Sequence, residues 1–113
     1  MATIFEKIIN KEIPATILYE DDTVIAIKDK FPKAPVHLLI ISKKVIPSFQ
    51  HIEKNDLPII GRMIEVSQKL AKEFKVEKAY RLLTNVGESA GQSIFHLHFH
   101  LLGGKTLSES EII

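Results

Sequence analysis

The stretch 96-HLHFHLLGG-104 places a histidine at every second position. Successive side chains of an extended strand point to opposite faces, so His96, His98 and His100 would share one face and the apolar residues between them the other. One face of such a strand is suited to a core, and the other carries three groups that titrate near neutral pH. The stretch therefore predicts a half-buried strand with a chemically active face.

The rest of the chain predicts two helices and further strands. Apolar residues at helical spacing predict a short helix over residues 4–13, which Pro14 ends, and a long helix over residues 57–74. Strand-forming runs, the histidine stretch included, occupy residues 15–21, 23–29, 36–42, 79–87 and 94–103. Consecutive strands with short connections cannot be parallel neighbours, so we expect an α+β fold with a five-stranded antiparallel sheet, one short helix and one long helix.

Length and composition limit the kind of protein. A chain of 113 residues is expected to form a single domain, residues 1–113. Its 15 basic and 14 acidic residues give no electrostatic reason to expect nucleic acid or a membrane surface as a partner. The longest strongly apolar run, residues 36–41, is too short to span a bilayer. The chain has no cysteine, and charged residues interrupt positions 1–15, which argues against a signal peptide, so we expect a cytoplasmic protein.

A fourth histidine, His37, begins another predicted strand, and a cluster of imidazoles permits more than one chemistry. Three neutral imidazoles can hold a divalent metal that leaves one position open for water. Alternatively, one imidazole attacks an electrophile while its neighbours stabilise the charge that develops, and no metal takes part. The spacing of the histidines leaves both alternatives open. A third is an interaction module in which His37 and the other three histidines hold a structural zinc ion.

The segment 85-NVGESAGQS-93 ends just before the histidines and has the composition of an anion-binding loop. Glycines let backbone amides approach a phosphate closely, and Asn85, Gln92 and Ser93 add hydrogen-bond donors. Taken alone, the segment is typical of an ordinary polar loop. Its position beside the histidines favours a phosphate site.

Taken together, these stretches resemble a known family. The segment FHLHFHLLGG (95–104) is similar to the motif His-x-His-x-His, followed by apolar residues, that defines the histidine triad (HIT) superfamily. TIFEKIINKEIPA, DKFPKAPVHLLIISKK and YRLLTNVGESAGQS occur in the order and spacing of its Hint branch, the nucleoside phosphoramidases. The resemblance implies a HIT-like fold and a homodimer whose sheets join edge to edge into one ten-stranded sheet, with the long helix near the interface.

The reaction implied by the resemblance is hydrolysis of purine nucleoside 5′-monophosphoramidates, which cleaves the P–N bond. In that scheme His98 attacks the α-phosphorus and forms a covalent nucleotidyl-histidine that water then hydrolyses, without a metal or other cofactor. His100 and Ser93 would donate hydrogen bonds to the phosphoryl oxygens or to the leaving nitrogen. His96 and His37 would orient these groups.

The nucleotide site implied by the resemblance combines polar and apolar residues. Asp29 would accept the ribose hydroxyls, a role that suits a carboxylate. Asn85 would reach the phosphate or the ribose, and Gln92 is a further candidate for the nucleotide. The apolar walls around the base would come from Ile4, Phe5, Ile8, Ile27 and Leu39, each of which is equally well explained as plain core.

Three features depart from the family pattern. Val45 stands where close relatives often carry histidine, and Lys30 replaces a usual aliphatic residue on the nucleoside side, which bears on base preference. The tail KTLSESEII (105–113) lacks the tryptophan-containing ending of animal relatives, which bears on leaving-group preference. The alternative function is a dinucleoside polyphosphate hydrolase or nucleotidyl transferase of the same superfamily, although the LLGG after the histidines, together with the Hint-like N-terminus, argues against it.

Overall fold

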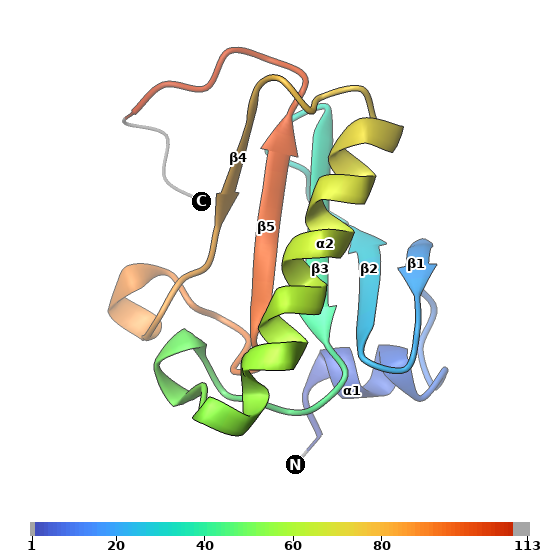
Figure 1. The fold of residues 1–113 in the computed structure, drawn as a ribbon, viewed down its shortest axis with the longest axis vertical. Helices are drawn as coiled ribbons and strands as arrows, with labels where there is room; N and C mark the ends of the chain where they lie inside the picture. The colour runs from blue at the N-terminus through green and yellow to red at the C-terminus, as the bar shows by residue number, and fades with distance from the viewer. Residues whose placement is uncertain (1, 110–113) are drawn as a thin grey trace.

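The computed structural model describes residues 2–109, which form one sheet with helices on both faces (Figure 1). The elements follow the chain in the order α1 (Ile4–Ile9), β1 (Ile17–Glu20), β2 (Val24–Lys28), β3 (Val36–Ser42), α2 (Leu57–Glu73), β4 (Tyr80–Leu83) and β5 (His98–Gly103). Short 3-10 turns lie in the connections: η1 (Phe49–His51), η2 (Lys54–Asp56) and η3 (Glu88–Ala90). The end of the atypical tail, residues 110–113, lies outside the described residues.

The strands are ordered β1-β2-β3-β5-β4, and every neighbouring pair is antiparallel. The expected α+β fold with a five-stranded antiparallel sheet and one long helix is therefore confirmed. β5 is inserted between β3 and β4, so His100 is paired with Leu39 on one side and with Leu83 on the other. The histidine-bearing strand is consequently an interior strand of the sheet.

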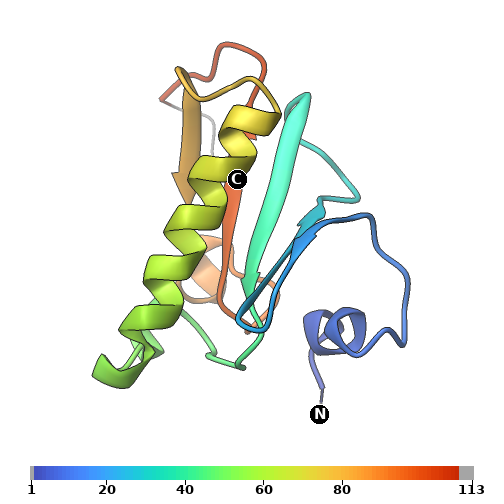
Figure 2. The same ribbon diagram turned by 45° about the vertical axis from the view of Figure 1, so that its right-hand side comes forward.

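The two faces of the sheet bury different apolar clusters. α2 covers one face, where Phe99 and Leu101 of β5 pack against apolar side chains of the helix. α1 lies on the opposite side (Figure 2), where its apolar residues pack against β2 and β3. Since side chains alternate along β5, His98 and His100 point to the side of α1. The sheet thus separates a core under the long helix from a histidine-bearing face beside the short one.

α1 is shorter than the sequence pattern predicts. It ends at Ile9, because Lys11 adopts a left-handed backbone angle (φ +62°) and the N–H of Glu12 turns back to the carbonyl of Lys7 at 2.8 Å. Residues other than glycine rarely take that conformation, so a lysine does not mark the end of a helix as a glycine would. The sequence before Pro14 therefore holds no signal for the earlier end of α1. No helix within residues 2–109 is long and apolar enough to cross a membrane.

β5 starts later than predicted, at His98 rather than at residue 94. The N–H of Leu97 donates to the carbonyl of Ile46 at 2.7 Å, and the N–H of Ser42 donates to the carbonyl of Leu97 at 3.4 Å. These bonds hold the chain before β5 against the loop that follows β3. His96 therefore lies outside the strand, with its backbone carbonyl next to the side chain of His98.

Candidate active site

His98 lies at the first position of β5, and its ring is fixed by the backbone just before it. Nδ1 of His98 lies 2.7 Å from the carbonyl oxygen of His96. A carbonyl only accepts hydrogen bonds, so Nδ1 carries the proton and Nε2 of the neutral ring keeps its lone pair. The ring of Phe5 packs edge-on against that of His98, with centroids 4.9 Å apart. The hydrogen bond thus fixes the tautomer of His98: in the neutral ring, Nε2 is the unprotonated nitrogen.

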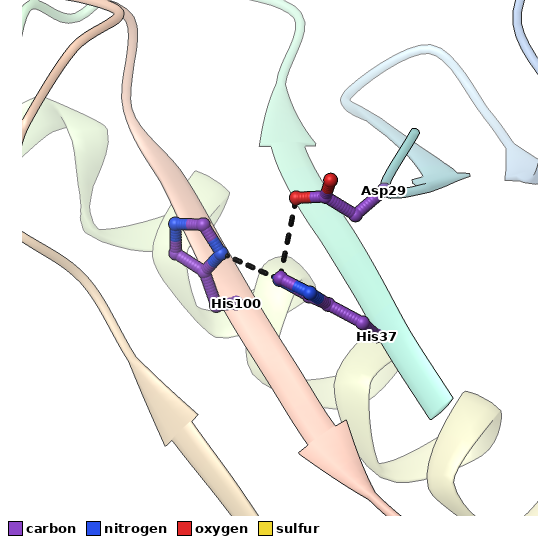
Figure 3. Close-up of side chains that lie close together, drawn as sticks. All are labelled: Asp29, His37 and His100. Carbon is purple, nitrogen blue, oxygen red and sulfur yellow. Dashed lines mark hydrogen bonds and ion pairs between the residues drawn. The ribbon is translucent and has the colours of Figure 1, made fainter. Parts of the chain in front are cut away.

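His100 and His37 form a hydrogen-bonded pair between β5 and β3 (Figure 3). Nε2 of His37 lies 2.9 Å from Nδ1 of His100. The N–H of Lys33 donates to Nδ1 of His37 at 3.0 Å, so His37 carries its proton on Nε2 and donates it to His100. His100 must then carry its own proton on Nε2. The pair supplies a neutral N–H donor beside His98, whose ring centroid lies 5.1 Å from that of His100.

Asp29 directly follows β2 and completes this group of side chains (Figure 3). Its Oδ2 lies 3.3 Å from Nε2 of His37, and its Oδ1 accepts the N–H of Phe31 at 2.8 Å. His37 therefore has two acceptors for one proton, and His100 is the nearer of them. Asp29 is partly exposed, so its carboxylate can also accept a hydrogen bond from a ligand.

His96 lies on the same side of the sheet but is fully buried. Its Nε2 lies 2.6 Å from the carbonyl oxygen of Ser42, so this nitrogen carries the proton. Nδ1 then accepts a hydrogen bond from the hydroxyl of Thr3 at 2.9 Å. Because both ring nitrogens are engaged by the protein, His96 contributes its backbone carbonyl to the site rather than its side chain.

All four imidazoles are held in the neutral form. Burial lowers the pKa of His37, His96 and His98 below its ordinary value. Burial also lowers the pKa of His100, to about 4, and the neighbouring His98 and His37 add to this effect while Asp29 opposes it. At neutral pH the neutral imidazole is therefore the main form in the site, and the ring of His98 is available as a nucleophile.

The side chains of Asp29, His37 and His100 lie close enough to be considered as a metal site, because one potential ligand atom of each lies within 4.8 Å of the others. The hydrogen bonds around His37 do not suit that role. A ligating histidine turns a lone pair to the metal and donates the N–H of its other nitrogen to a carbonyl or carboxylate. In His37 the other nitrogen instead accepts an N–H from Lys33. These hydrogen bonds favour a relay over a metal site. In this relay Lys33 donates to His37, and His37 donates to His100 with Asp29 as a second acceptor.

The loop before β5 is organised by Gln92, which is buried. Its Oε1 accepts the N–H of Gly87 at 2.9 Å, and its Nε2 donates to the carbonyls of Pro47 at 2.8 Å and Ile94 at 3.1 Å. Both N–H groups of the amide are therefore used by the backbone. This corrects the expectation that Gln92 offers a donor to the nucleotide, since it fastens the loop to the segment after β3 instead.

The remaining candidate residues fall into two groups. Four apolar candidates are buried together between α1 and the sheet, in the cluster that contains Phe5, Ile8, Ile27 and Leu39. Ile4 is 49% exposed and lies outside that cluster. Lys30 and Ser93 are exposed, and Asn85 is half-buried after β4. The structure thus gathers four of the five apolar candidates on the histidine side of the sheet.

Two hydrogen bonds of the site are not predicted by any local pattern of the sequence. Thr3 and Glu6 have the spacing of a capping box, which signals a helix start, but nothing local shows that the Thr3 hydroxyl reaches a ring 93 residues away. The hydroxyl of Thr84 donates to the carbonyl of His98 at 2.8 Å. Contacts between such distant segments depend on the order of the strands, which a local pattern does not encode.

The family is established by comparison with known proteins. Residues 10–107 match the family model of the HIT domain. A HIT-like protein of Chlamydia trachomatis is 48% identical over 107 residues, which cover 95% of this chain and 96% of that protein. A HIT family hydrolase from Clostridium thermocellum is 47% identical with a TM-score of 0.92, and the match covers 96% of this chain and 95% of that structure. A histidine triad nucleotide-binding protein from Candida albicans is 30% identical with a TM-score of 0.81, over 97% of this chain and 86% of that one. In sequence, in fold and in its alternating histidines, this chain belongs to the HIT family.

Proposed function

We propose that this protein hydrolyses purine nucleoside 5′-monophosphoramidates by cleaving the bond between phosphorus and nitrogen. The observation that carries the proposal is the hydrogen bond from Nδ1 of His98 to the carbonyl of His96, at 2.7 Å. It leaves the lone pair of a neutral ring on Nε2, as nucleophilic attack requires. Proteins similar to this chain include two named HIT family hydrolases and two named histidine triad nucleotide-binding proteins, which supports the same class of reaction and substrate.

In the first step Nε2 of His98 attacks the α-phosphorus and the P–N bond breaks. The electron pair of that bond goes to the leaving nitrogen, which takes a proton from solvent and departs as the amine. The nucleotidyl-histidine that forms carries a positive charge on its ring, and the carbonyl of His96 stabilises this charge through the Nδ1–H. In the second step water attacks the phosphorus, the bond to Nε2 breaks, and the nucleotide leaves with release of one proton.

His100 acts as a neutral hydrogen-bond donor in this proposal. Since His37 donates to Nδ1 of His100, protonation of that nitrogen would bring two N–H groups face to face, which agrees with a pKa of about 4. The Nε2–H of His100 is then suited to a phosphoryl oxygen, on which negative charge grows during the attack. Ser93, which is exposed just before β5, is assigned to the same group of donors.

Asp29 and the apolar cluster beside α1 are assigned to the nucleoside. The partly exposed carboxylate of Asp29 is suited to accept the hydroxyls of a ribose. Phe5 packs against His98, so a base held among the apolar neighbours of Phe5 would bring its phosphate near the reactive ring. Asn85 is assigned to the phosphate or ribose, and the exposed Lys30 to base preference.

The test is release of amine from adenosine 5′-phosphoramidate by the wild-type protein, by His98→Ala and by the control His51→Ala. His51 is an exposed histidine that bonds to Ser48, outside the site. We expect His51→Ala to turn over like wild type and His98→Ala to lose about a thousandfold or more of kcat. Mass spectrometry of the working enzyme should find one nucleotidyl group on the peptide that contains His98. Undiminished turnover by His98→Ala would refute the proposal.

The same assay separates this reaction from the alternative within the superfamily. A dinucleoside polyphosphate hydrolase would turn over diadenosine tetraphosphate faster than the phosphoramidate. A nucleotidyl transferase would pass the nucleotidyl group to an added acceptor rather than to water. We expect kcat/KM for the phosphoramidate to exceed that for diadenosine tetraphosphate by about tenfold or more.

We further propose that two copies join through β4 into one ten-stranded sheet. β4 is an edge strand of four residues. Leu82 is 39% exposed and is paired with Leu101, which packs beneath α2, so a second copy joined at β4 would cover Leu82 near the long helix. Light scattering should report a dimer for the wild-type protein and a monomer for Leu82→Glu. A monomeric wild-type protein would contradict this assembly.

A further inference from the structure

We infer that Thr3, at the N-cap of α1, is a positioning residue for His98 and acts on it through the buried ring of His96. Thr3 belongs to neither the alternating histidines nor the loop before β5. Thr3 thereby helps to decide which nitrogen of His98 carries the proton. The expected effect of Thr3 on kcat rests on the proposed function, whereas its expected effect on the tautomer of His98 does not.

The hydroxyl of Thr3 has two partners at once. It accepts the N–H of Glu6 at 3.1 Å, while the carboxylate of Glu6 accepts the N–H of Thr3 at 2.9 Å, which completes a capping box. The same hydroxyl oxygen lies 2.9 Å from Nδ1 of His96. Because Nε2 of His96 donates to the carbonyl of Ser42, Nδ1 has no proton and Thr3 must be the donor. One side chain therefore starts α1 and satisfies the second nitrogen of His96.

Without Thr3, Nδ1 of His96 would be a buried acceptor with no donor. His96 is fully buried, so water cannot replace the lost hydrogen bond without a movement of the ring or of α1. The ring of Phe5 on α1 packs edge-on against His96, at 5.7 Å between centroids, and any such movement would disturb that contact. The Thr3 hydroxyl thus fixes the ring of His96 and the backbone that carries it.

The position of His96 reaches His98 through one peptide group. The N–H of that peptide, on Leu97, donates to the carbonyl of Ile46 at 2.7 Å. Its C=O, on His96, accepts the Nδ1–H of His98 at 2.7 Å. Hydrogen bonds at the two ends of one peptide polarise it and strengthen each other. A rotation of this peptide would remove the acceptor of the His98 proton, which could then move to Nε2 and block the lone pair.

A set of variants separates this role from simple helix capping. Thr3→Val has nearly the same shape but loses both the cap acceptor and the donor to His96. Glu6→Ala loses the other half of the capping box and leaves the Thr3 hydroxyl in place, so it is the matched control. Thr3→Ser keeps the hydroxyl and is the rescue variant.

Imidazole nitrogen NMR at neutral pH reports the proton position in His98 whether or not the protein is active. We expect the wild-type protein, Glu6→Ala and Thr3→Ser to keep the proton of His98 on Nδ1, and Thr3→Val to show a mixture of both tautomers. For phosphoramidate hydrolysis, kcat should fall about tenfold or more in Thr3→Val with KM little changed. In Glu6→Ala and Thr3→Ser, kcat should stay within about twofold of wild type.

Thr3→Asp guards against a failure of Thr3→Val to fold. Aspartate caps a helix at least as well as threonine, but its carboxylate has no proton to donate. Nδ1 of His96 should therefore take up a proton, so the pKa of His96 should rise and kcat should fall. Equal tautomers and equal kcat in Thr3→Val, Thr3→Asp and Glu6→Ala would show that Thr3 only caps α1. If the wild-type protein hydrolyses no phosphoramidate, the proposed function fails, and the NMR comparison still decides the positioning role.

Discussion

Nε2 of His37 lies 2.9 Å from Nδ1 of His100, and the proton between the two rings belongs to His37. This assignment follows because the N–H of Lys33 occupies the other nitrogen of His37. It makes His100 a neutral donor, and it gives Asp29, at 3.3 Å, the place of a second acceptor for the same proton. Each hydrogen bond of this relay can be removed separately, and each removal has a distinct expected effect.

Removal of His37 should release His100 from its fixed tautomer. In His37→Ala, water can reach Nδ1 of His100, and the N–H of His37 that faces this nitrogen and opposes its protonation is lost. The pKa of His100 should therefore rise from about 4 toward the ordinary value of 6.5. NMR titration of the His100 ring measures this shift, and kcat should fall about tenfold. His51→Ala serves as the control, and an unchanged pKa of His100 in His37→Ala would contradict the relay.

Asp29→Asn should weaken the binding of ribose-containing substrates more than it slows the chemistry. The variant keeps the shape of the side chain and removes the charge that accepts hydroxyl donors. Hydrogen bonds to a charged group contribute about 1.5–3 kcal/mol, so KM should rise about tenfold to a hundredfold.

A substrate lacking the ribose hydroxyls provides the control for Asp29→Asn. If Asp29 acts on those hydroxyls, wild type and variant should have the same KM for a dideoxynucleoside phosphoramidate, as in a double-mutant cycle. An equal loss for both substrates would assign the effect of Asp29 to the His37 ring rather than to the ribose.

Acid should destabilise the folded protein in a defined pH window. Burial lowers the pKa of the four site imidazoles below 6.5, and that of His100 to about 4. Between these values the unfolded chain binds more protons than the folded chain, so the free energy of unfolding falls as the pH falls from 6.5 to 4. His100 alone should account for on the order of 2 kcal/mol of this loss.

Urea denaturation across this window measures the effect. His100→Asn should reduce the dependence on pH, because the variant has no imidazole to protonate at that position. His51→Ala, which changes an exposed histidine outside the site, is the control variant. A free energy of unfolding that is constant from pH 6.5 to pH 4 would show that the site imidazoles are not held neutral by burial.

Gln92→Leu should destabilise the protein by about 2–4 kcal/mol, because the amide satisfies three backbone groups in a buried setting. Gln92→Glu keeps the acceptor for the N–H of Gly87 and loses the two donors, so its loss should be large as well. Thermal and urea denaturation measure both variants. The exposed Gln50 is the matched control, and Gln50→Leu should change stability by less than about 0.5 kcal/mol.

Local sequence patterns predict which face of β5 carries the histidines. They do not predict which strands lie beside β5 in the sheet. His98 and His100 lie on the side of α1 while Phe99 and Leu101 pack beneath α2, because alternation is a property of the extended backbone. The insertion of β5 beside β3 depends on packing between distant segments. His37 and His100 are 63 residues apart and meet only because of that strand order.

The sequence also could not predict which ring nitrogens of the site carry protons. The carbonyls of His96 and Ser42 and the N–H of Lys33 decide which ring nitrogens carry protons, and backbone groups of this kind occur in every sequence. For Gln92 the residue type suggests a role that the structure does not support. An amide in a glycine-containing loop suggests a donor for a ligand, yet the Gln92 side chain is itself buried and both of its N–H groups donate to backbone carbonyls.

The contact of the Thr3 hydroxyl with His96 has a practical consequence for anyone who purifies this protein. A polyhistidine leader fused just upstream of Thr3 brings foreign chain, and further imidazoles, within a few residues of a buried ring that holds the proposed nucleophile. Rate constants measured with such a leader describe the fusion as much as the enzyme. A handle at the opposite terminus, or a leader removed by protease before assay, keeps foreign chain away from Thr3 and the ring of His96.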